Sequence, residues 1–275
     1  MIKPSFSAIC VTAGRTHLLE EAVACFCRQD YPGDSELIIL NTCPQQQLEL
    51  GNGYDNVRII NLAERPKSLG DARNMAIAES DNEWLVVWDD DDSYLPHHLS
   101  NFAEHADGNQ WLWLARQYYA EGFKIKGIVQ GTMNVVAFRK EAWVKLNGYS
   151  ALSVGEDRAF VGKLTTQFPG KKVELADERI SFLYGWGQSI HHISGLGDDK
   201  PGRLSSWDRA EKHIKQQIAA RKIPTGKVRL EPKLRHDYEA MVKHFIGTHL
   251  TQKCWMLRQS STPPSVAMVL LGRLW

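Results

Sequence analysis

Four consecutive aspartates, Asp89, Asp90, Asp91 and Asp92, directly follow an apolar run at residues 84–88. A short aromatic and β-branched run of this kind predicts a strand buried on both faces, so the carboxylates are expected at its carboxyl end. Open α/β sheets bind their ligands at that end. Adjacent carboxylates disfavour one another's ionisation unless a cation neutralises them, and a hard divalent ion is the usual solution. The structural alternative is a solvated acidic turn before the helix that Pro96 begins.

Other polar residues stand at similar junctions. Thr12 and Arg15 follow the first apolar run of the chain, and Asn41 ends the second. Glu156 and Asp157 begin a segment with helical spacing, where the helix macrodipole favours carboxylates. A carboxylate at a helix start is also suited to take a proton from a hydroxyl group. These residue types therefore indicate cation binding together with acid–base chemistry.

Strands alternate with helices in the first half of the chain. Apolar runs predict strands at residues 5–11, 36–40, 57–62 and 84–88. The segment 67–79 predicts a helix with Ser68 as its N-cap. This alternation predicts an α/β fold with a doubly wound, mostly parallel central sheet and helices on both faces. The loops after the first, second and fourth strands then share one edge of the sheet.

The second half predicts a different arrangement. Long aromatic strands are expected at residues 111–120 and 123–129, joined by a hairpin turn at Glu121 and Gly122. A further strand at 134–139, a short helix at 140–146, a helix at 156–168 and a strand at 180–186 follow. Core packing is the commonest explanation of the aromatic side chains in these strands, although an apolar or sugar-stacking surface is the alternative.

After Pro201 the composition shifts towards helix formers and positive charge. Residues 211–258 carry eleven Lys or Arg against four Asp or Glu. An apolar stripe along one helix is most simply packed on the rest of the protein, and it consists of Tyr238, Met241, Val242, Phe245 and Ile246. Basic helices beside an apolar tail, such as residues 266–271, also suit a peripheral contact with anionic lipid.

The composition excludes several classes of protein. A net charge of +1 over 275 residues argues against bulk binding to nucleic acid. The five cysteines lack paired metal-ligand spacing, which is typical of reduced thiols in a cytoplasmic protein. Cys25 and Cys27 lie two apart on a predicted helix and are expected to point to different faces. No stretch reaches the length that spans a bilayer.

The order and spacing of these motifs resemble the family 2 glycosyltransferases of the GT-A fold over about residues 5 to 195. That family's first strand ends in a Pro-Thr-Tyr-Asn-Arg-like loop, of which this chain keeps Thr12 and Arg15. Its Gly-x-x-Ala-Arg-Asn element is matched by residues 70–74, which contain Arg73. Its Asp-x-Asp string maps onto residues 88–92, and its Gly-Gly-Tyr and Glu-Asp elements map onto residues 147–149 and 156–157.

The resemblance implies a role for each matched residue. The nucleotide would contact Thr12, Arg15, Arg73, Asp89 and Asp90. Asp91 would hold Mn²⁺ or Mg²⁺, with His192 from a late loop as a further metal ligand or, equally, a structural histidine. Asp157 would be the catalytic base, and Glu156 would orient the acceptor or cap the helix. Where the family commonly has Asp-Asp after its second strand, Asn41 stands here and can still pair with a base edge.

The resemblance implies a metal-dependent, inverting glycosyltransferase. It would move a sugar from a nucleotide diphosphate sugar to a hydroxyl of a glycan, lipid-linked or other acceptor, in glycan or cell-surface polysaccharide synthesis. UDP-sugars are the expected donors, with guanosine and thymidine nucleotides left open. Residues 1–110 would form the nucleotide-sugar half of the domain, 111–200 the acceptor and catalytic half, and 201–275 a basic helical extension.

Three other classes of protein are alternatives to this function. A non-catalytic nucleotide or carbohydrate-binding module of the same fold remains an alternative, because the loop after the first strand departs from the family's pattern. A nucleotidyltransferase would need a glycine-rich loop with Lys or Arg after the first strand to hold a triphosphate, and this loop has one Gly and one Arg. A phosphatase with a strand-end aspartate nucleophile would want Asp-x-Asp after the first strand, where Thr12, Ala13 and Gly14 stand instead.

Overall fold

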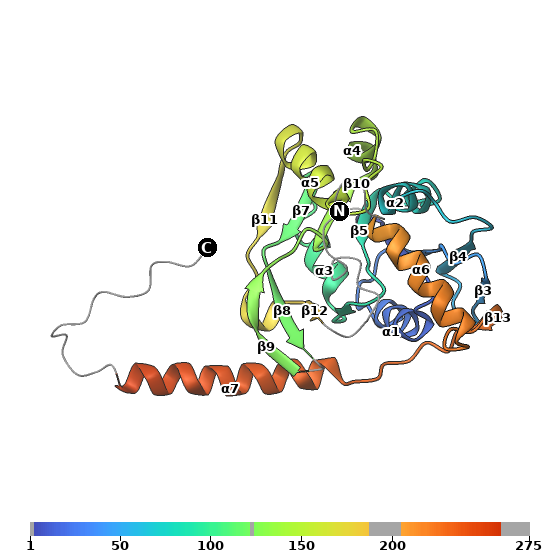
Figure 1. Ribbon diagram of the computed structural model, residues 1–275. Helices are drawn as coiled ribbons and strands as arrows, with labels where there is room; N and C mark the ends of the chain where they lie inside the picture. The colour runs from blue at the N-terminus through green and yellow to red at the C-terminus, as the bar shows by residue number, and fades with distance from the viewer. Residues whose placement is uncertain (1–2, 122–123, 187–204, 260–275) are drawn as a thin grey trace.

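The computed structural model describes residues 3–121, 124–186 and 205–259. A seven-stranded sheet with the order β11-β7-β10-β5-β1-β2-β4 forms its centre (Figure 1). Four neighbouring strands of this sheet run parallel, and they are β1 (Phe6–Thr12), β2 (Ser35–Asn41), β4 (Val57–Asn61) and β5 (Trp84–Val87). β10 (Val136–Arg139) runs antiparallel to β5 and to β7 (Trp111–Leu114), and β11 (Gly170–Val173) runs parallel to β7. The doubly wound, mostly parallel sheet predicted from the sequence is confirmed.

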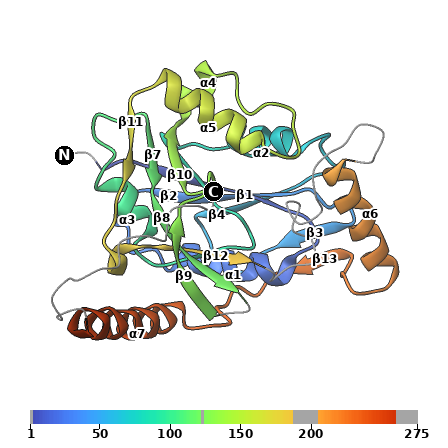
Figure 2. The same cartoon turned by 60° about the vertical axis from the view of Figure 1, so that its left-hand side comes forward.

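Helices cover both faces of this sheet (Figures 1 and 2). On one face lie α2 (Leu69–Ala78), α4 (Lys140–Lys145) and α5 (Glu156–Gln167), and on the other lies α1 (Thr16–Cys27). Ser68 caps α2 as predicted, because its hydroxyl accepts a hydrogen bond from the Asp71 N–H at 3.1 Å. Cys25 is buried and Cys27 is exposed, so the two thiols do point to different faces of α1.

A second sheet has the order β6-β12-β8-β9. Its strands are β6 (Ser93–Tyr94), β8 (Arg116–Glu121), β9 (Lys124–Gln130) and β12 (Phe182–Trp186). The prediction of one strand over residues 111–120 is therefore wrong, since the chain passes from the central sheet to this one at Ala115. Residues 111–114 are buried on both faces, whereas exposed and buried residues mix along β8, so the two parts suit different layers. The predicted turn at Gly122 lies outside the described residues.

The end of β5 is fixed by aromatic packing. The Trp88 ring stacks on Tyr94 with centroids 3.7 Å apart, and its indole N–H donates to the Ala22 carbonyl at 3.1 Å. The Tyr94 hydroxyl accepts a hydrogen bond from the Asp89 backbone N–H at 2.6 Å. α3 (His98–Ala103) follows, and its buried His98 packs edge-on against Trp88 and Tyr94. The backbone that carries the aspartates is thus anchored to β5, β6 and α1.

The C-terminal part adds two helices on separate sides of the molecule. α6 (Ser206–Ala219) is followed by β13 (Gly226–Arg229), which pairs in parallel with β3 (Gln46–Glu49). Earlier in the chain, the 3-10 helix η1 (Asp177–Arg179) precedes β12. α7 (Tyr238–Gln259) runs beside β9 and then extends away from the sheets (Figures 1 and 2). Its predicted apolar stripe packs on the core, with Tyr238 and Val242 buried. Among the described residues, no helix is both long and apolar enough to cross a membrane.

The loop before α5 rests directly on α2. A Cβ atom at Gly70 would lie 2.0 Å from the Ser150 carbonyl oxygen, and the Gly70 N–H donates to the Leu152 carbonyl at 2.9 Å. Overpacking of this kind costs roughly 1–3 kcal/mol. We therefore expect Gly70→Ala to lower the free energy of unfolding by about that amount in urea titrations.

The matched control is Gly162→Ala in α5, where an added Cβ meets no heavy atom within 4 Å. Alanine is favoured over glycine in a helix by up to about 1 kcal/mol, so this variant should be neutral or more stable. Equal unfolding free energies for the two variants would show that the loop does not press on α2.

Candidate functional site

A cavity of about 280 Å³ lies at the carboxyl ends of β1, β2 and β5. Residues far apart in sequence form its walls. Those that the sequence singled out and that line it are Thr12, Arg15, Arg73, Asp89, Asp91, Glu156 and Asp157. Asp92 of the aspartate run also lines it. Further lining residues, not foreseen from the sequence, include Thr42, Arg65, Asn134, Tyr184 and Trp207. Seven of the ten residues proposed from the sequence therefore converge on one cavity.

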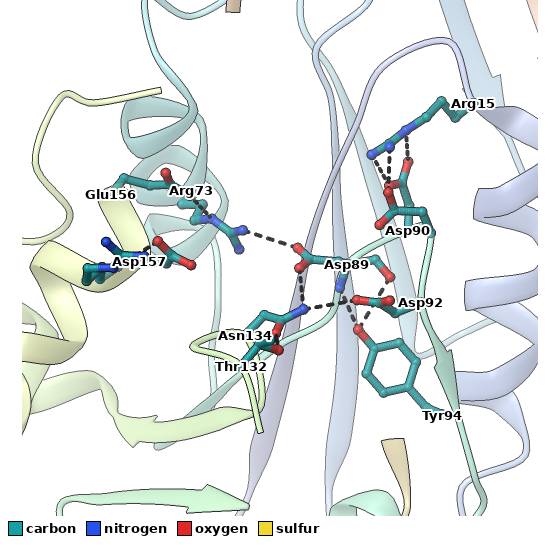
Figure 3. A network of polar contacts seen from close by, with 12 residues as sticks. Arg15, Arg73, Asp89, Asp90, Asp92, Tyr94, Thr132, Asn134, Glu156 and Asp157 are labelled. Carbon is teal, nitrogen blue, oxygen red and sulfur yellow. Dashed lines mark hydrogen bonds and ion pairs between the residues drawn. The ribbon is translucent and has the colours of Figure 1, made fainter. Parts of the chain in front are cut away.

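Asp90 and Asp91 are neutralised by Arg15 from the loop between β1 and α1. Asp90 is buried, and its carboxylate accepts a hydrogen bond from Thr12 Oγ1 at 2.6 Å. The Arg15 guanidinium forks onto both oxygens of Asp90 and reaches Asp91 through Nη1 at 2.8 Å (Figure 3). Two hydrogen bonds from one planar group hold the carboxylate in a fixed orientation. Asp90 lies behind the cavity wall, whereas Asp91 lines the cavity.

Asp89 and Asp92 share the side-chain amide of Asn134, a residue that the sequence did not single out. Asn134 Nδ2 donates to Asp89 Oδ2 at 3.1 Å and to Asp92 Oδ2 at 3.0 Å. Asp92 is buried, and the Gly185 N–H donates to its other oxygen at 3.1 Å. Burial raises the pKa of Asp92 well above its usual value, with the charges of Asp91 and Asp89 acting in the same direction. Asn134 precedes a strand as a single polar residue, which is too common a pattern to have marked it.

Arg73 connects the aspartates to the start of α5. Its Nη2 lies 3.2 Å from Asp89 Oδ1, and its Nε lies 3.4 Å from Glu156 Oε1 (Figure 3). Glu156 is only 4% exposed, and burial raises its pKa to about 7, although the charge of Arg73 opposes that shift. Asp157 is half-buried, lines the cavity, and accepts a hydrogen bond from the Arg158 N–H at 2.6 Å. Glu156 is thus tied to Arg73, while Asp157 faces the cavity.

Asn41 is directed into the protein. Its amide donates to the Gln46 carbonyl at 3.0 Å and to Asn61 Oδ1 at 2.9 Å, and its oxygen accepts from the Cys43 N–H at 3.0 Å. Asn41 is fully buried and does not line the cavity. Both of its amide hydrogens are therefore used in holding β2, β3 and β4 together. His191 and His192 lie outside the described residues.

The carboxylates of the cavity fit a hard divalent ion. Asp89, Asp91 and Asp92 line the cavity, and carboxylate oxygen is the ligand type that Mg²⁺ and Mn²⁺ prefer. Within the described ranges, no three His, Cys, Asp or Glu side chains converge as a complete set of ligands. An ion would thus take one or two ligands from the chain and the rest from water and a phosphorylated ligand, which is usual for Mg²⁺.

Comparisons with known proteins point in one direction. The sequence model described as "Glycosyl transferase family 2" matches residues 7–148. The structure of S. aureus TarS 1-349 in complex with UDP-GlcNAc aligns with a TM-score of 0.56 at 15% identity, over 90% of this chain and 73% of that chain. A second TarS 1-349 structure aligns with a TM-score of 0.52 at 15% identity, over 78% of this chain and 65% of that chain.

A third structure is a mannosyltransferase, PcManGT from Pyrobaculum calidifontis, in complex with GDP-Man and Mn²⁺. It aligns with a TM-score of 0.50 at 16% identity, over 82% of this chain and 66% of that chain. At such identities these likenesses show the fold alone, and that fold is GT-A. No curated protein sequence matches the chain.

The raised pKa of Glu156 makes stability depend on pH. The folded protein holds a proton on Glu156 up to about pH 7, whereas the unfolded chain releases it near 4.5. Between these values the folded state binds more protons, so this group's contribution to stability falls as pH rises. We expect the unfolding free energy of the wild type relative to Glu156→Gln to drop by roughly 2–3 kcal/mol between pH 5 and pH 8.

Urea titrations of both proteins at the two pH values measure this difference directly. Glu174→Gln, which changes an exposed glutamate, is the control and should follow the wild type at both values. Parallel pH dependence of the wild type and Glu156→Gln would contradict the raised pKa.

Proposed function

This chain belongs to glycosyl transferase family 2, and from that membership we propose that it is a metal-dependent, inverting enzyme. It transfers a sugar from a nucleoside diphosphate sugar to an acceptor hydroxyl. UDP-sugars are our preferred donors, which the complex of TarS with UDP-GlcNAc supports. GDP-sugars stay open, because a mannosyltransferase of similar fold holds GDP-Man. We assign the enzyme to glycan or cell-surface polysaccharide synthesis.

One observation carries this proposal. Asp91 and Asp157 come from segments far apart in the sequence, and both line the same cavity, as do Arg15 and Arg73. A carboxylate suited to an ion and a carboxylate suited to proton transfer thus share one space with two guanidinium groups. Glycosyl transfer from a charged leaving group needs both functions.

The leaving diphosphate gains negative charge as its bond to the sugar breaks. Mn²⁺ or Mg²⁺, held by Asp91, would neutralise part of that charge as a Lewis acid. Arg15 and Arg73 line the cavity and add fixed positive charge beside it. Arg73 and Asn134 hold Asp89 on two sides. In this proposal Asp89 contacts the nucleoside. Asp90 keeps Arg15 in position from behind the cavity wall.

Asp157 acts as the base. As the acceptor oxygen attacks the anomeric carbon, its proton passes to the Asp157 carboxylate and the sugar–phosphate bond breaks on the opposite side. This in-line displacement inverts the anomeric centre. Glu156 is less suited to the task, because it is buried against Arg73 and its raised pKa leaves it partly protonated near neutral pH. We give Glu156 the role of positioning Arg73.

Two isosteric variants separate binding from chemistry. We expect Asp91→Asn to lose most of the gain in UDP or GDP affinity that Mn²⁺ provides, as measured by calorimetry with and without the ion. Asp157→Asn should bind the nucleotide and ion normally, while release of nucleoside diphosphate from a screened sugar nucleotide falls by about 10²–10⁴-fold. Unchanged turnover in both variants would refute the two roles. Nucleotide affinity that is equal with and without Mn²⁺ in the wild type would refute metal dependence.

We also propose a peripheral contact between the C-terminal extension and anionic membrane, on the strength of its basic residues and the apolar residues 266–271. Cosedimentation with phosphatidylglycerol vesicles tests it. The full chain should pellet with these vesicles at low salt and release at high salt, whereas a chain ending at Arg258 should bind less. Equal binding of the full and shortened chains would argue against a membrane role for the tail.

A further inference from the structure

The helix α6, which follows the segment matched by the family model, forms one wall of the cavity. Trp207, Ala210 and Ile214 of α6 line it together with Ala13 and Thr42. An apolar cluster of Ile214, Ile223 and Cys43, packed against Ala13 and Ile218, holds the helix on the loops after β1 and β2. α6 is therefore a fixed part of the cavity and not a loosely attached extension.

Arg65 is clamped by this helix. Its guanidinium carbon lies 3.8 Å from the centre of the Trp207 ring, and the Trp207 indole N–H donates to the carbonyl of the next residue, Pro66, at 2.8 Å. Trp207 itself is buried, at 3% exposure. The same side chain thus fixes both the backbone of this segment and the plane of the Arg65 guanidinium.

The guanidinium N–H groups of Arg65 have few hydrogen-bond acceptors among the described residues. Among the described residues, no carboxylate lies within ion-pair distance of it, whereas Arg15 and Arg73 in the same cavity are each paired with two. Its Nε is buried without a hydrogen-bond acceptor in that part of the chain, and its Nη1 makes only long contacts of 3.4 and 3.5 Å with Thr42. A buried donor left in this state costs free energy until a ligand supplies an acceptor.

The position of Arg65 indicates which part of the donor would supply it. In the proposed function the diphosphate lies beside Asp91, where the metal ion would neutralise it together with Arg15 and Arg73. Arg65 instead lies against Thr42, after β2, and against Trp207 of α6. The lining of the same cavity includes the apolar side chains Ala13, Ala210 and Ile214, which suit a flat ring. Asn41, the sequence-based candidate for contacting the base, has both amide hydrogens engaged elsewhere.

We propose that α6 is part of the donor site and that Trp207 positions Arg65 to read the carbonyl edge of the nucleobase. The inference rests on the proposed function. Arginine only donates hydrogen bonds, so it pairs with the acceptors O4 of uracil or O6 and N7 of guanine. Adenine and cytosine present an amino group at the corresponding place. The site accordingly selects uridine or guanosine diphosphates over those of adenosine and cytidine.

Calorimetry on the full chain tests this with UDP, GDP, ADP and CDP, and with inorganic pyrophosphate as a probe that lacks a base, all with Mn²⁺. We expect Arg65→Met to weaken UDP or GDP binding by about tenfold to a hundredfold, with little change for ADP, CDP or pyrophosphate. Trp207→Leu should shift the same selectivity by about threefold to tenfold, because it releases Arg65 without removing its charge. Arg65→Lys keeps the charge but loses the planar fork, and should recover only part of the selectivity.

Arg58→Met removes an exposed arginine from β4, away from the cavity, and controls for the loss of one positive charge. It should bind all five probes as the wild type does. A loss in Arg65→Met that is equal for UDP, ADP and pyrophosphate would make Arg65 a phosphate contact and overturn the inference. So would unchanged binding in variants whose thermal unfolding shows them to be folded, or a wild type that binds all four nucleotides equally. A wild type that binds none of them would instead overturn the proposed function, and this inference with it.

Discussion

The aspartates at the end of β5 would repel one another if they stood alone, because they are adjacent and two of them, Asp90 and Asp92, are buried. Two arginines from different elements compensate three of the four aspartates. Arg15 reaches Asp90 and Asp91 from the loop after β1, and Arg73 reaches Asp89 from α2. The arrangement of the surrounding loops follows from the need to bring these two guanidinium groups to one strand end.

The same ion pairs connect the cavity's two sides. Arg73 contacts Glu156 as well as Asp89, so the start of α5 is held against the strand that carries the aspartates. Asp157 follows Glu156 at the start of α5 and is therefore held on the same side of the cavity. A divalent ion on Asp91 would add positive charge beside Arg15, and the phosphates of a donor would then balance both. With such an ion bound, the cavity would suit a ligand with several negative charges, such as the nucleoside diphosphate of the proposed function.

Sequence reasoning found the features that depend on local pattern. Apolar runs predict β1, β2, β4 and β5, and the shared edge of parallel strands predicts that Thr12 and Asp91 lie together. It failed where the outcome depends on distant partners. The break at Ala115 reflects a change from one sheet to the other, which an unbroken aromatic run does not reveal. Asn41 points into the protein because its amide donates hydrogen bonds to the Gln46 carbonyl and to Asn61 Oδ1. Asn134 and Trp207 matter only through contacts with residues over 40 positions away, such as Asp89 and Pro66.

The central claim is a single displacement with one base, Asp157, at the anomeric carbon. Proton NMR of the sugar released from an α-linked sugar nucleotide, recorded in the first minutes before mutarotation, tests it most directly. Inversion predicts that the β-anomer appears first and then equilibrates. An initial α-anomer would mean retention, which one base on the acceptor side cannot produce, and would contradict this account of the site.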